Sequence, residues 1–370
     1  MEKDLAKNKI QNLKNDKMME NKNLLTKQYT GALNIAAFII IIAGAMYAQT
    51  FVTQLLLAFF ISIISSQPIY WLQKKKVSLG LSIAIVFTVI IVVFVGFGEL
   101  IGTSLSSFSD DAPKYEQNLQ EMGGTILQMA SDKGINISTG EMTDLFDPSK
   151  IMGVTAGFLS ELGGVMGSAL TIIFLVLFLL MELDSFPIKI NAIKKESGST
   201  NSLAFLNIIG DNIRHYLSIK TMTSLFTGLL IWISLIIIGV DYAIIWALIA
   251  FLLNYIPNIG SIIAAVPAVL FALVQLGFGG AFWTIGVFVA VNMIIGNIIE
   301  PKMMGKGLGL STFVVFVSLI FWGFILGSVG MFLSVPLTMA IKIVLEQKPK
   351  TKWIAILLGT QDEAQVILDE

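Results

Sequence analysis

The stretch NYIPNIGSIIAAVP, residues 254–267, lies inside an apolar region long enough for a membrane helix, yet it contains two prolines, two asparagines and a glycine. Proline and glycine interrupt helices because proline lacks an N–H group and glycine is conformationally free. In a bilayer, irregular backbone survives only where it is buried in protein or lines a polar cavity. The stretch therefore predicts a broken helix at membrane depth with a functional reason for the break.

The composition of the whole chain agrees with a membrane location. Its 370 residues are 55% hydrophobic and 13% charged, with a mean hydropathy of +0.81, which is too apolar for a soluble globular protein of this length. Cysteine is absent and histidine occurs once, so we expect no disulfide framework, no metal site and no cofactor. The net charge of −1 gives no reason to expect a nucleic-acid partner.

Apolar windows of about 20 residues, the length needed to cross a bilayer, locate the expected spans. Six windows fit one crossing each: 31–48, 51–72, 79–101, 163–181, 221–239 and 281–299. Two longer windows, 243–276 and 310–345, fit a re-entrant hairpin each. We therefore predict an all-α polytopic membrane protein with six full transmembrane helices and two re-entrant helical hairpins.

The lysines give the orientation. With both termini in the cytoplasm, the basic residues of the connecting loops are cytoplasmic, as the positive-inside rule requires: Lys74, Lys75, Lys76, Lys189, Lys194, Lys195, Lys302 and Lys306. The exceptions are Lys114, Lys133 and Lys150, which fall in the outer segment. The expected organisation runs as follows: a disordered cytoplasmic tail (1–28), transmembrane helices 1–3 (29–101), a small helical extracytoplasmic cap (102–162), transmembrane helix 4 (163–182), a cytoplasmic loop with an interfacial helix (183–220), a transport module (221–345) and a cytoplasmic tail (346–370).

Two amphipathic segments fill in the polar regions. In the cap, DDAPKYEQNLQEM (residues 110–122) predicts a helix that begins at an aspartate cap before Pro113, with Tyr115, Leu119, Met122 and Ile126 on one face. On the inner side, residues 201–219 place Phe205, Ile209, Ile213 and Tyr216 on one stripe, as in an interfacial helix.

The opening stretch has a weak echo 70 residues later in the chain. Residues 239–267 align with 309–336, so that Gly239 meets Gly309 and Gly260 meets Gly330. Because the preceding spans 221–239 and 281–299 run in opposite directions, the two units would be inverted. Inverted repeats with broken helices that meet near the midplane are a recurrent architecture of secondary transporters. The alternative is that the glycines and prolines serve ordinary helix packing.

Broken helices free backbone N–H and C=O groups that can bind a polar solute, so we expect the solute site at the two hairpin tips. Asn254, Tyr255, Asn258 and Ser261 would bind solute hydroxyls, whereas Pro257, Gly260, Gly327 and Gly330 would shape the tips. The same site would include Asn292, Asn297 and Ser328.

Two charged residues near the membrane allow two interpretations each. Glu300 shares a helix face with Asn297 and could be a proton or cation site, or it could pair with Lys302 or Lys306 at the inner interface. Arg214 could gate the pathway or contact solute, or it could anchor to lipid phosphate.

An enzyme is not expected. The sequence contains no G-x-S-x-G nucleophile elbow and no P-loop, so transport by this chain would be driven by gradients rather than by ATP.

Residues 255–273 (YIPNIGSIIAAVPAVLFAL), residues 296–346, which begin GNIIEPKMMGKGLGLST, and the tail motif WIAILLG resemble the autoinducer-2 exporter (AI-2E) family, in particular its TqsA-type branch. The resemblance is strongest in the C-terminal half. It implies a protein of the bacterial cytoplasmic (inner) membrane that exports the signal autoinducer-2, a small polar furanosyl compound, or a related solute. It also implies a homo-oligomer, with a pentamer as the expected form.

Two other functions stay open. Some members of the resembled family are described as sodium or lithium/proton antiporters, which would need a titrating membrane carboxylate such as Glu300. A non-transport scaffold, in which the outer cap binds a partner, would make residues 108–146 more important than either hairpin.

Overall fold

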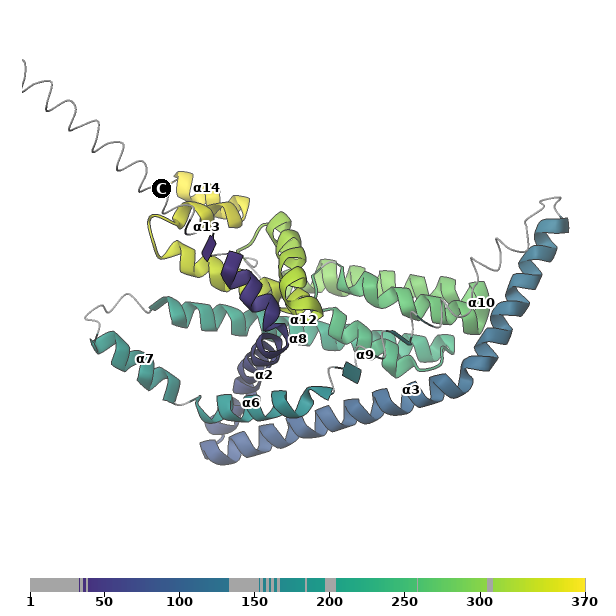
Figure 1. Cartoon of the computed structure of the whole chain (residues 1–370), viewed down its shortest axis with the longest axis horizontal. Helices are drawn as coiled ribbons and strands as arrows, with labels where there is room; N and C mark the ends of the chain where they lie inside the picture. Colours follow the sequence, from purple (N-terminus) through teal and green to yellow (C-terminus); the bar gives the residue numbers. More distant parts are fainter. Residues whose placement is uncertain are drawn as a thin grey trace, which may run out of the picture. The chain divides into compact units, whose positions relative to one another are not determined.

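The computed structural model describes residues 33, 36–37, 39–132, 153, 156–157, 160, 163–164, 167–183, 185–196, 204–257, 259–304 and 309–369. This part of the chain is helical and contains no strand. Its elements are α2 (Gln49–Lys74), α3 (Leu79–Asp132), α6 (Ala169–Met181), α7 (Ser185–Glu196), α8 (Ala204–Ile238), α9 (Ala243–Leu253), α10 (Gly260–Ile294), the π-helix η1 (Ile295–Ile299), α11 (Glu300–Met304), α12 (Thr312–Glu346), α13 (Lys352–Leu358) and α14 (Gln361–Asp369) (Figure 1). The chain divides into two compact units, Met1–Val52 and Thr53–Glu370, and the contacts below lie within the second.

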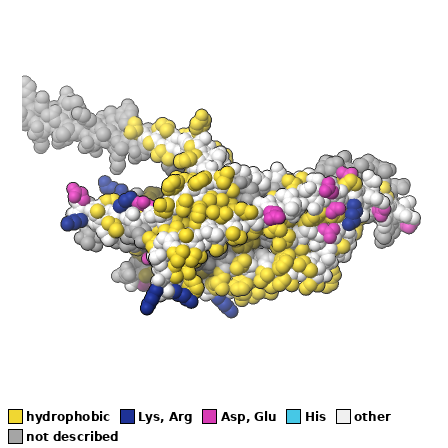
Figure 2. All heavy atoms as spheres, turned by 90° about the horizontal axis from the view of Figure 1, so that it is seen from below, with side chains coloured by type: hydrophobic (Ala, Val, Ile, Leu, Met, Phe, Trp, Pro, Cys, Tyr) yellow, Lys and Arg dark blue, Asp and Glu magenta, His cyan; other side chains and the backbone are white. Residues whose placement is uncertain are grey.

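Several helices are long and apolar enough to cross a membrane. In the described part of the chain these are Gln49–Lys74, Leu79–Thr125, Ile208–Ile238, Gly260–Met304 and Thr312–Glu346. Large hydrophobic side chains are exposed along them, and Figure 2 shows such side chains over the middle of one face. This surface suits lipid rather than water, so the prediction of a polytopic membrane protein is confirmed. The predicted window 163–181 is described as a helix only from Ala169, and window 31–48 is described only in part.

The predicted start of a cap helix before Pro113 is wrong. Helix α3 is a single helix of 54 residues that continues through Pro113, which gives it a length of about 80 Å (Figure 1). The residues predicted to share one face of this segment do so where they are described. Tyr115 and Leu119 are buried, and Met122 packs against the same cluster. The side chain of Ile126 and residues 133–152 of the predicted cap lie outside the described residues.

The far end of α3 contacts the link between α8 and α9. The Tyr115 hydroxyl donates to Asp241 (3.1 Å) and the Tyr242 hydroxyl donates to Asp111 (2.5 Å). Burial, followed by the hydrogen bond to Asp111, raises the pKa of Tyr242, so its hydroxyl stays protonated as a donor. Phe271 of α10 lies between these tyrosines in an aromatic cluster. Residues 111–115 are therefore fastened to the α8–α9 link.

The predicted interfacial helix at 201–219 is not a separate element. It forms the first part of α8, one helix of 35 residues that continues into the predicted span. Its apolar stripe is directed into the protein: Ile213 and Tyr216 are buried in a cluster with Leu333 of α12, while Asp211 and Asn212 are exposed. The side chain of Phe205 lies outside the described residues. The amphipathic pattern was correct, but the face packs on protein.

Glycines break the two longest late helices. Helix α10 loses helical geometry at Gly277 (φ 72°, ψ −163°), and α12 does so at Gly327 (φ 66°, ψ −151°). In a straight helix, Trp322 and Thr338 would be about 24 Å apart along the axis, yet the Trp322 indole donates to the Thr338 hydroxyl at 3.0 Å. The segments before and after Gly327 therefore fold against each other. The predicted interruption of this window is present.

The turn at 254–259 separates α9 from α10, as the opening stretch predicted. Just after each turn the chain passes so close to itself that only glycine fits. A Cβ at Gly260 would overlap the Leu253 carbonyl oxygen, and one at Gly330 would overlap the carbonyl oxygen of Trp322. Gly239 and Gly309, the other aligned pair, both have positive φ (88° and 64°). The backbone thus matches the 70-residue echo at both glycine pairs.

The two helices that precede these broken segments run antiparallel. At one end, Ile238 of α8 and Gly280 of α10 line the same groove. At the other end, Lys220 of α8 is ion-paired with Glu300, which follows α10 and η1. Residue numbers therefore increase in opposite directions along the pair, which is the relation expected of inverted units.

Candidate functional site

Helix α8 has a stripe of buried polar side chains in its middle. Tyr216, Lys220, Ser224 and Thr227 follow one another at intervals of four, four and three residues, so they lie along one face of the helix. Each has at most 4% of its surface exposed. Buried polar groups are expensive in an apolar protein unless they are paired or used, so this polar stripe marks α8 as the centre of the candidate site.

The tip of the first broken segment is bonded to this face. The Asn254 amide donates to the Ser224 hydroxyl (3.0 Å), and the Tyr255 hydroxyl donates to the Thr221 hydroxyl (2.7 Å). Both tip side chains are buried, at 6% and 4% exposure. In this arrangement, two side chains predicted to bind solute are held by the protein itself.

The second broken segment reaches the same place. The Phe332 ring, five residues beyond the Gly327 break, stacks on the Tyr255 ring with a centroid separation of 4.4 Å and an interplanar angle of 27°. Leu333 and Val335 of this segment pack in the cluster that contains Tyr216. Residues from both predicted tips therefore meet beside the polar stripe.

An ion pair lies within the stripe. The Lys220 ammonium donates to the Glu300 carboxylate at 2.6 Å, and the two side chains are only 4% and 15% exposed. Glu300 is half-buried, and its partner in the structure is Lys220 rather than Lys302, which is exposed. Residues 305–308, and with them Lys306, lie outside the described part.

Two groups on the stripe have hydrogen-bonding capacity left over. Among the described residues, the Tyr216 hydroxyl and the Thr227 hydroxyl are buried without a hydrogen-bond partner. Thr284 of α10 has the same property. Buried groups of this kind are uncommon in native proteins, because each forfeits the hydrogen bonds it had with water. The free hydroxyls could accept or donate to a polar ligand.

The other predicted solute residues are divided between the site and its surroundings. Ser261 is buried at the start of α10, and Pro257 is half-buried in the turn. Asn292 is half-buried, whereas Asn297 and Ser328 are exposed. Asn258 lies outside the described residues.

Asn297 and Glu300 do not share an environment, although they were expected to share a helix face. The reason is η1: in a π-helix, residues five apart stack, so Glu300 follows the buried Ile295 while Asn297 turns outward.

Arg214 lies two residues before Tyr216, the first residue of the stripe. Its guanidinium is 3.5 Å from Asp211 and lies 5.9 Å from the ring centroid of Tyr70 on α2. Its Nε is buried without a hydrogen-bond partner among the described residues. The side chain is therefore held against α2 and its own helix, with one buried donor unpaired among the described residues.

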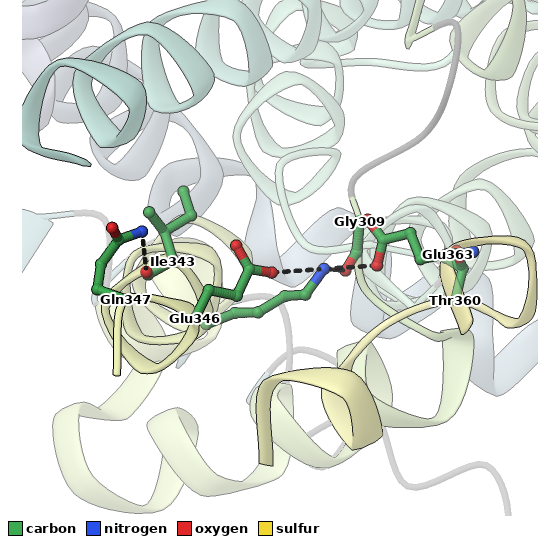
Figure 3. A network of polar contacts seen from close by, with 7 residues as sticks. Gly309, Ile343, Glu346, Gln347, Thr360 and Glu363 are labelled. Carbon is green, nitrogen blue, oxygen red and sulfur yellow. Dashed lines mark hydrogen bonds and ion pairs between the residues drawn. The ribbon is translucent and has the colours of Figure 1, made fainter. Parts of the chain in front are cut away.

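A second buried lysine ties the end of α12 to the C-terminal helices. The Lys342 ammonium contacts three oxygen atoms, from Gly309 (2.6 Å), Glu363 (2.6 Å) and Glu346 (3.3 Å), which converge on it in Figure 3. Close by, the Ser311 N–H donates to the Leu358 carbonyl at 3.0 Å. This C-terminal clasp, formed by Gly309, Lys342, Glu346 and Glu363, fixes both ends of α12 near α13 and α14.

Sequence interpretation missed Lys220, Thr221 and Ser224, the residues that receive the first tip. A signal was available: a lysine inside an apolar stretch of 18 or more residues is rare and needs a partner. The predicted boundary between an interfacial helix and a span at residue 220 placed Lys220 at a helix end, where it would have been unremarkable.

Comparison with known proteins places this chain in a family. Residues 35–350 match the model of the AI-2E family transporters. The chain is 40% identical over 354 residues to a putative transport protein of Haemophilus influenzae, covering 94% of this chain and 99% of that protein. It is 36% identical over 325 residues to the AI-2 transport protein TqsA of Escherichia coli, covering 88% and 94%. A more distant relative, the putative transport protein YrrI of Bacillus subtilis, is 26% identical over 309 residues, covering 80% of this chain and 86% of YrrI.

The match covers the spans, the broken segments and the stripe. Together with the apolar helices, it identifies a multi-pass membrane protein of a transporter family. The chain therefore belongs to the AI-2E family of transporters.

Proposed function

We propose that the protein exports a small polar solute of the autoinducer-2 type across the cytoplasmic membrane as a secondary transporter. The observation that carries the proposal is the buried polar stripe of α8 at the place where two glycine-broken segments meet. Polar groups and irregular backbone at membrane depth are tolerated where they line a solute pathway. The name of the relative TqsA supports the choice of solute.

The two broken segments act as inverted re-entrant hairpins in this proposal. The antiparallel course of α8 and the second part of α10 supports the inversion, and the lysine distribution supports cytoplasmic termini. The first hairpin comprises α9 and α10 as far as Gly277, and the second comprises α12 on both sides of Gly327.

With the first tip hydrogen-bonded to α8, the site is closed. Ser224 and Thr221 hold the amide of Asn254 and the hydroxyl of Tyr255, so a solute with several hydroxyls can replace these partners one for one. When solute hydrogen bonds replace those within the protein, few buried groups are left unpaired. The energy barrier to separating the tip from α8 therefore stays low. Tyr216 and Thr227 supply further hydroxyls. Alternating access then requires the tips to part from α8 on one side at a time.

The test is autoinducer-2 flux in proteoliposomes that contain the purified protein. Wild-type protein is expected to move the solute down its gradient. Asn254→Leu, which removes the amide and fills its place with an apolar side chain, is expected to reduce flux at least tenfold with unchanged incorporation. Ser82→Ala is the matched control, because it removes a buried hydroxyl whose one hydrogen bond within the described residues goes to the Ser78 carbonyl of its own helix (3.0 Å). Wild-type flux equal to that of empty liposomes would refute the function, and full flux in Asn254→Leu would refute the site.

One observation separates this function from cation/proton antiport. An antiporter needs a carboxylate that exchanges ions with water, but Glu300 is half-buried and held at 2.6 Å by Lys220. The ion pair therefore favours export of an uncharged solute. Sodium-driven proton movement in the same proteoliposomes, abolished by Glu300→Gln, would reverse this preference.

A further inference from the structure

The last turns of α2 carry polar and basic side chains on the face that contacts α8. The Gln67 amide donates to the Ser218 hydroxyl at 3.5 Å, and the Arg214 guanidinium lies 5.9 Å from the ring centroid of Tyr70. Because Gln67, Tyr70 and Lys74 are three and four residues apart, they lie along one face of α2. Lys74 therefore continues this face one turn beyond Tyr70, at a Cβ separation of about 6 Å.

Three lysines in succession end α2, and all three are exposed: Lys74, Lys75 and Lys76. The Lys75 ammonium lies 4.4 Å from the ring centroid of Trp71. Lys76 has a φ of 68°, a left-handed conformation that usually selects glycine at a helix end. A lysine in this conformation accepts strain that glycine would avoid, which indicates that positive charge is favoured here. The negative end of the helix dipole accounts for only part of this preference.

Arg214 has more donors than the protein uses. A guanidinium has five N–H groups. Within the described residues its one acceptor is Asp211, at 3.5 Å, which is the long limit of a hydrogen bond, and this carboxylate is 75% exposed. The arginine side chain is itself 36% exposed, so N–H groups other than the buried Nε are accessible. Guanidinium groups bind phosphate with two parallel hydrogen bonds, so a phosphate fits this position.

We propose that the contact between α2 and α8 binds the headgroup phosphate of an anionic phospholipid. Arg214 and Lys74 bind the phosphate, and the exposed rings of Tyr70 and Trp71 lie against the lipid at headgroup depth, where tyrosine and tryptophan are enriched. A cluster of basic residues beside a membrane helix attracts anionic lipids. A zwitterionic lipid is disfavoured, because its choline cation would meet the three lysines.

The bound lipid would join two helices with different roles. Arg214 belongs to α8, which also carries the polar stripe, and Lys74 belongs to α2. A phosphate that bridges them holds α8 against α2 just before the stripe begins. The inference concerns the membrane partner of the protein and is independent of the solute that it moves.

The test is thermal unfolding of the purified full-length protein in neutral detergent. The protein is titrated with phosphatidylglycerol, with phosphatidylcholine or with inorganic phosphate. Phosphatidylglycerol is expected to raise the melting temperature of wild type saturably by several degrees. Phosphatidylcholine and inorganic phosphate at the same concentrations are expected to leave it unchanged. No rise with phosphatidylglycerol, or an equal rise with inorganic phosphate, would overturn the proposal.

Four variants locate the binding site. Arg214→Gln and Lys74→Gln are each expected to need about tenfold more phosphatidylglycerol for half of the rise, since each removes a charge-assisted contact. Arg214→Lys keeps the charge but loses the paired hydrogen bonds, so its requirement should lie between those of wild type and Arg214→Gln. Lys302→Gln is the matched control, because it removes an exposed lysine from α11, and it should titrate like wild type.

Equal losses in Arg214→Gln and Lys302→Gln would assign lipid binding to general positive charge and overturn the site. If Arg214→Gln does not fold, Lys74→Gln decides, because it changes a fully solvent-facing position at the end of α2. An unchanged requirement for phosphatidylglycerol in folded Lys74→Gln would then overturn the proposal. None of these measurements uses solute flux, so their failure and the failure of the proposed function are distinguishable.

Discussion

The two broken segments are anchored at opposite ends. The turn 254–259 is held at its tip, because Asn254 and Tyr255 hydrogen-bond to α8. The segment broken at Gly327 has an aromatic contact near its tip, Phe332 on Tyr255, and its polar anchor is the C-terminal clasp, which holds both ends of α12. The two segments aligned by sequence are therefore equivalent in backbone but not in attachment.

This difference indicates which segment moves more easily. Separation of the Gly327 tip from Tyr255 breaks apolar contacts, whereas separation of the first tip from α8 breaks two buried hydrogen bonds that must be replaced by solute or water. We therefore expect the second segment to part first, turning about its two clasped ends.

The largest effect is expected at the two glycines that occupy equivalent positions in the broken segments. Gly260→Ala and Gly330→Ala each force a Cβ into a backbone carbonyl, so each is expected to destabilise the protein by more than about 3 kcal/mol. The measurement is the fraction of protein that remains monodisperse after heating in detergent. Gly286→Ala is the matched control, because a Cβ there meets nothing within 4 Å and alanine favours a helix. Normal behaviour of either close-packed variant would show that the chain crossings are looser than described.

The glycines also show which features of the fold can be predicted from the sequence alone. Gly260 and Gly330 were predictable because helix breakers in apolar windows have few explanations in a membrane. The helix boundaries at residues 113 and 220 were predicted wrongly for a common reason: proline and charge are local signals of helix ends, and tertiary packing overrode both. Tyr115 and Lys220 find their partners 126 and 80 residues away, at Asp241 and Glu300.

The candidate site was predictable in part for a similar reason. Its tip residues, such as Asn254, stand out as polar groups in apolar sequence. The receiving residues on α8 include Thr221 and Ser224, which are common in membrane helices, where their hydroxyls can bond to their own backbone. The π-turn that orients Glu300 has no sequence signature at all. These residues come together only through the tertiary fold.

The next effect concerns the polar anchor of the first tip. Ser224→Ala leaves the buried Asn254 amide without its acceptor, so we expect a loss of about 1–3 kcal/mol in unfolding free energy. Denaturant titration of the purified protein measures it. A cycle with Asn254→Ala isolates the pair, since the double variant removes both partners. Ser62→Ala is the control and should cost less, because among the described residues its buried hydroxyl bonds to the Ala58 carbonyl of its own helix alone. Additive losses in the cycle would mean that the pair is not coupled.

Tyr255→Phe should have a smaller effect because it keeps the ring on Phe332 and removes one hydroxyl. Thr221 still donates to the Leu217 carbonyl (2.7 Å), so no buried donor is left unpaired and the cost is expected to be about 1 kcal/mol. Tyr255→Leu removes the stacking too and should cost about 0.5–1.5 kcal/mol more. The same denaturant titration compares the two variants. Equal losses would indicate that the aromatic contact between the tips contributes nothing to stability.

The smallest effect is expected at the clasped ends of the second segment. Glu363→Gln removes one charged partner of Lys342 but leaves the Gly309 carbonyl and Glu346 in place. Because the Glu363 side chain is 46% exposed and water screens it, the loss should be below about 1 kcal/mol. A more sensitive readout is trypsin cleavage after the exposed Lys352, which should be faster in the variant. High salt should accelerate cleavage of wild type toward the same rate, since salt weakens the ion pair. Asp362→Asn at the adjacent exposed position should cleave like wild type, and equal acceleration by both variants would assign the effect to general charge loss on α14 rather than to the clasp.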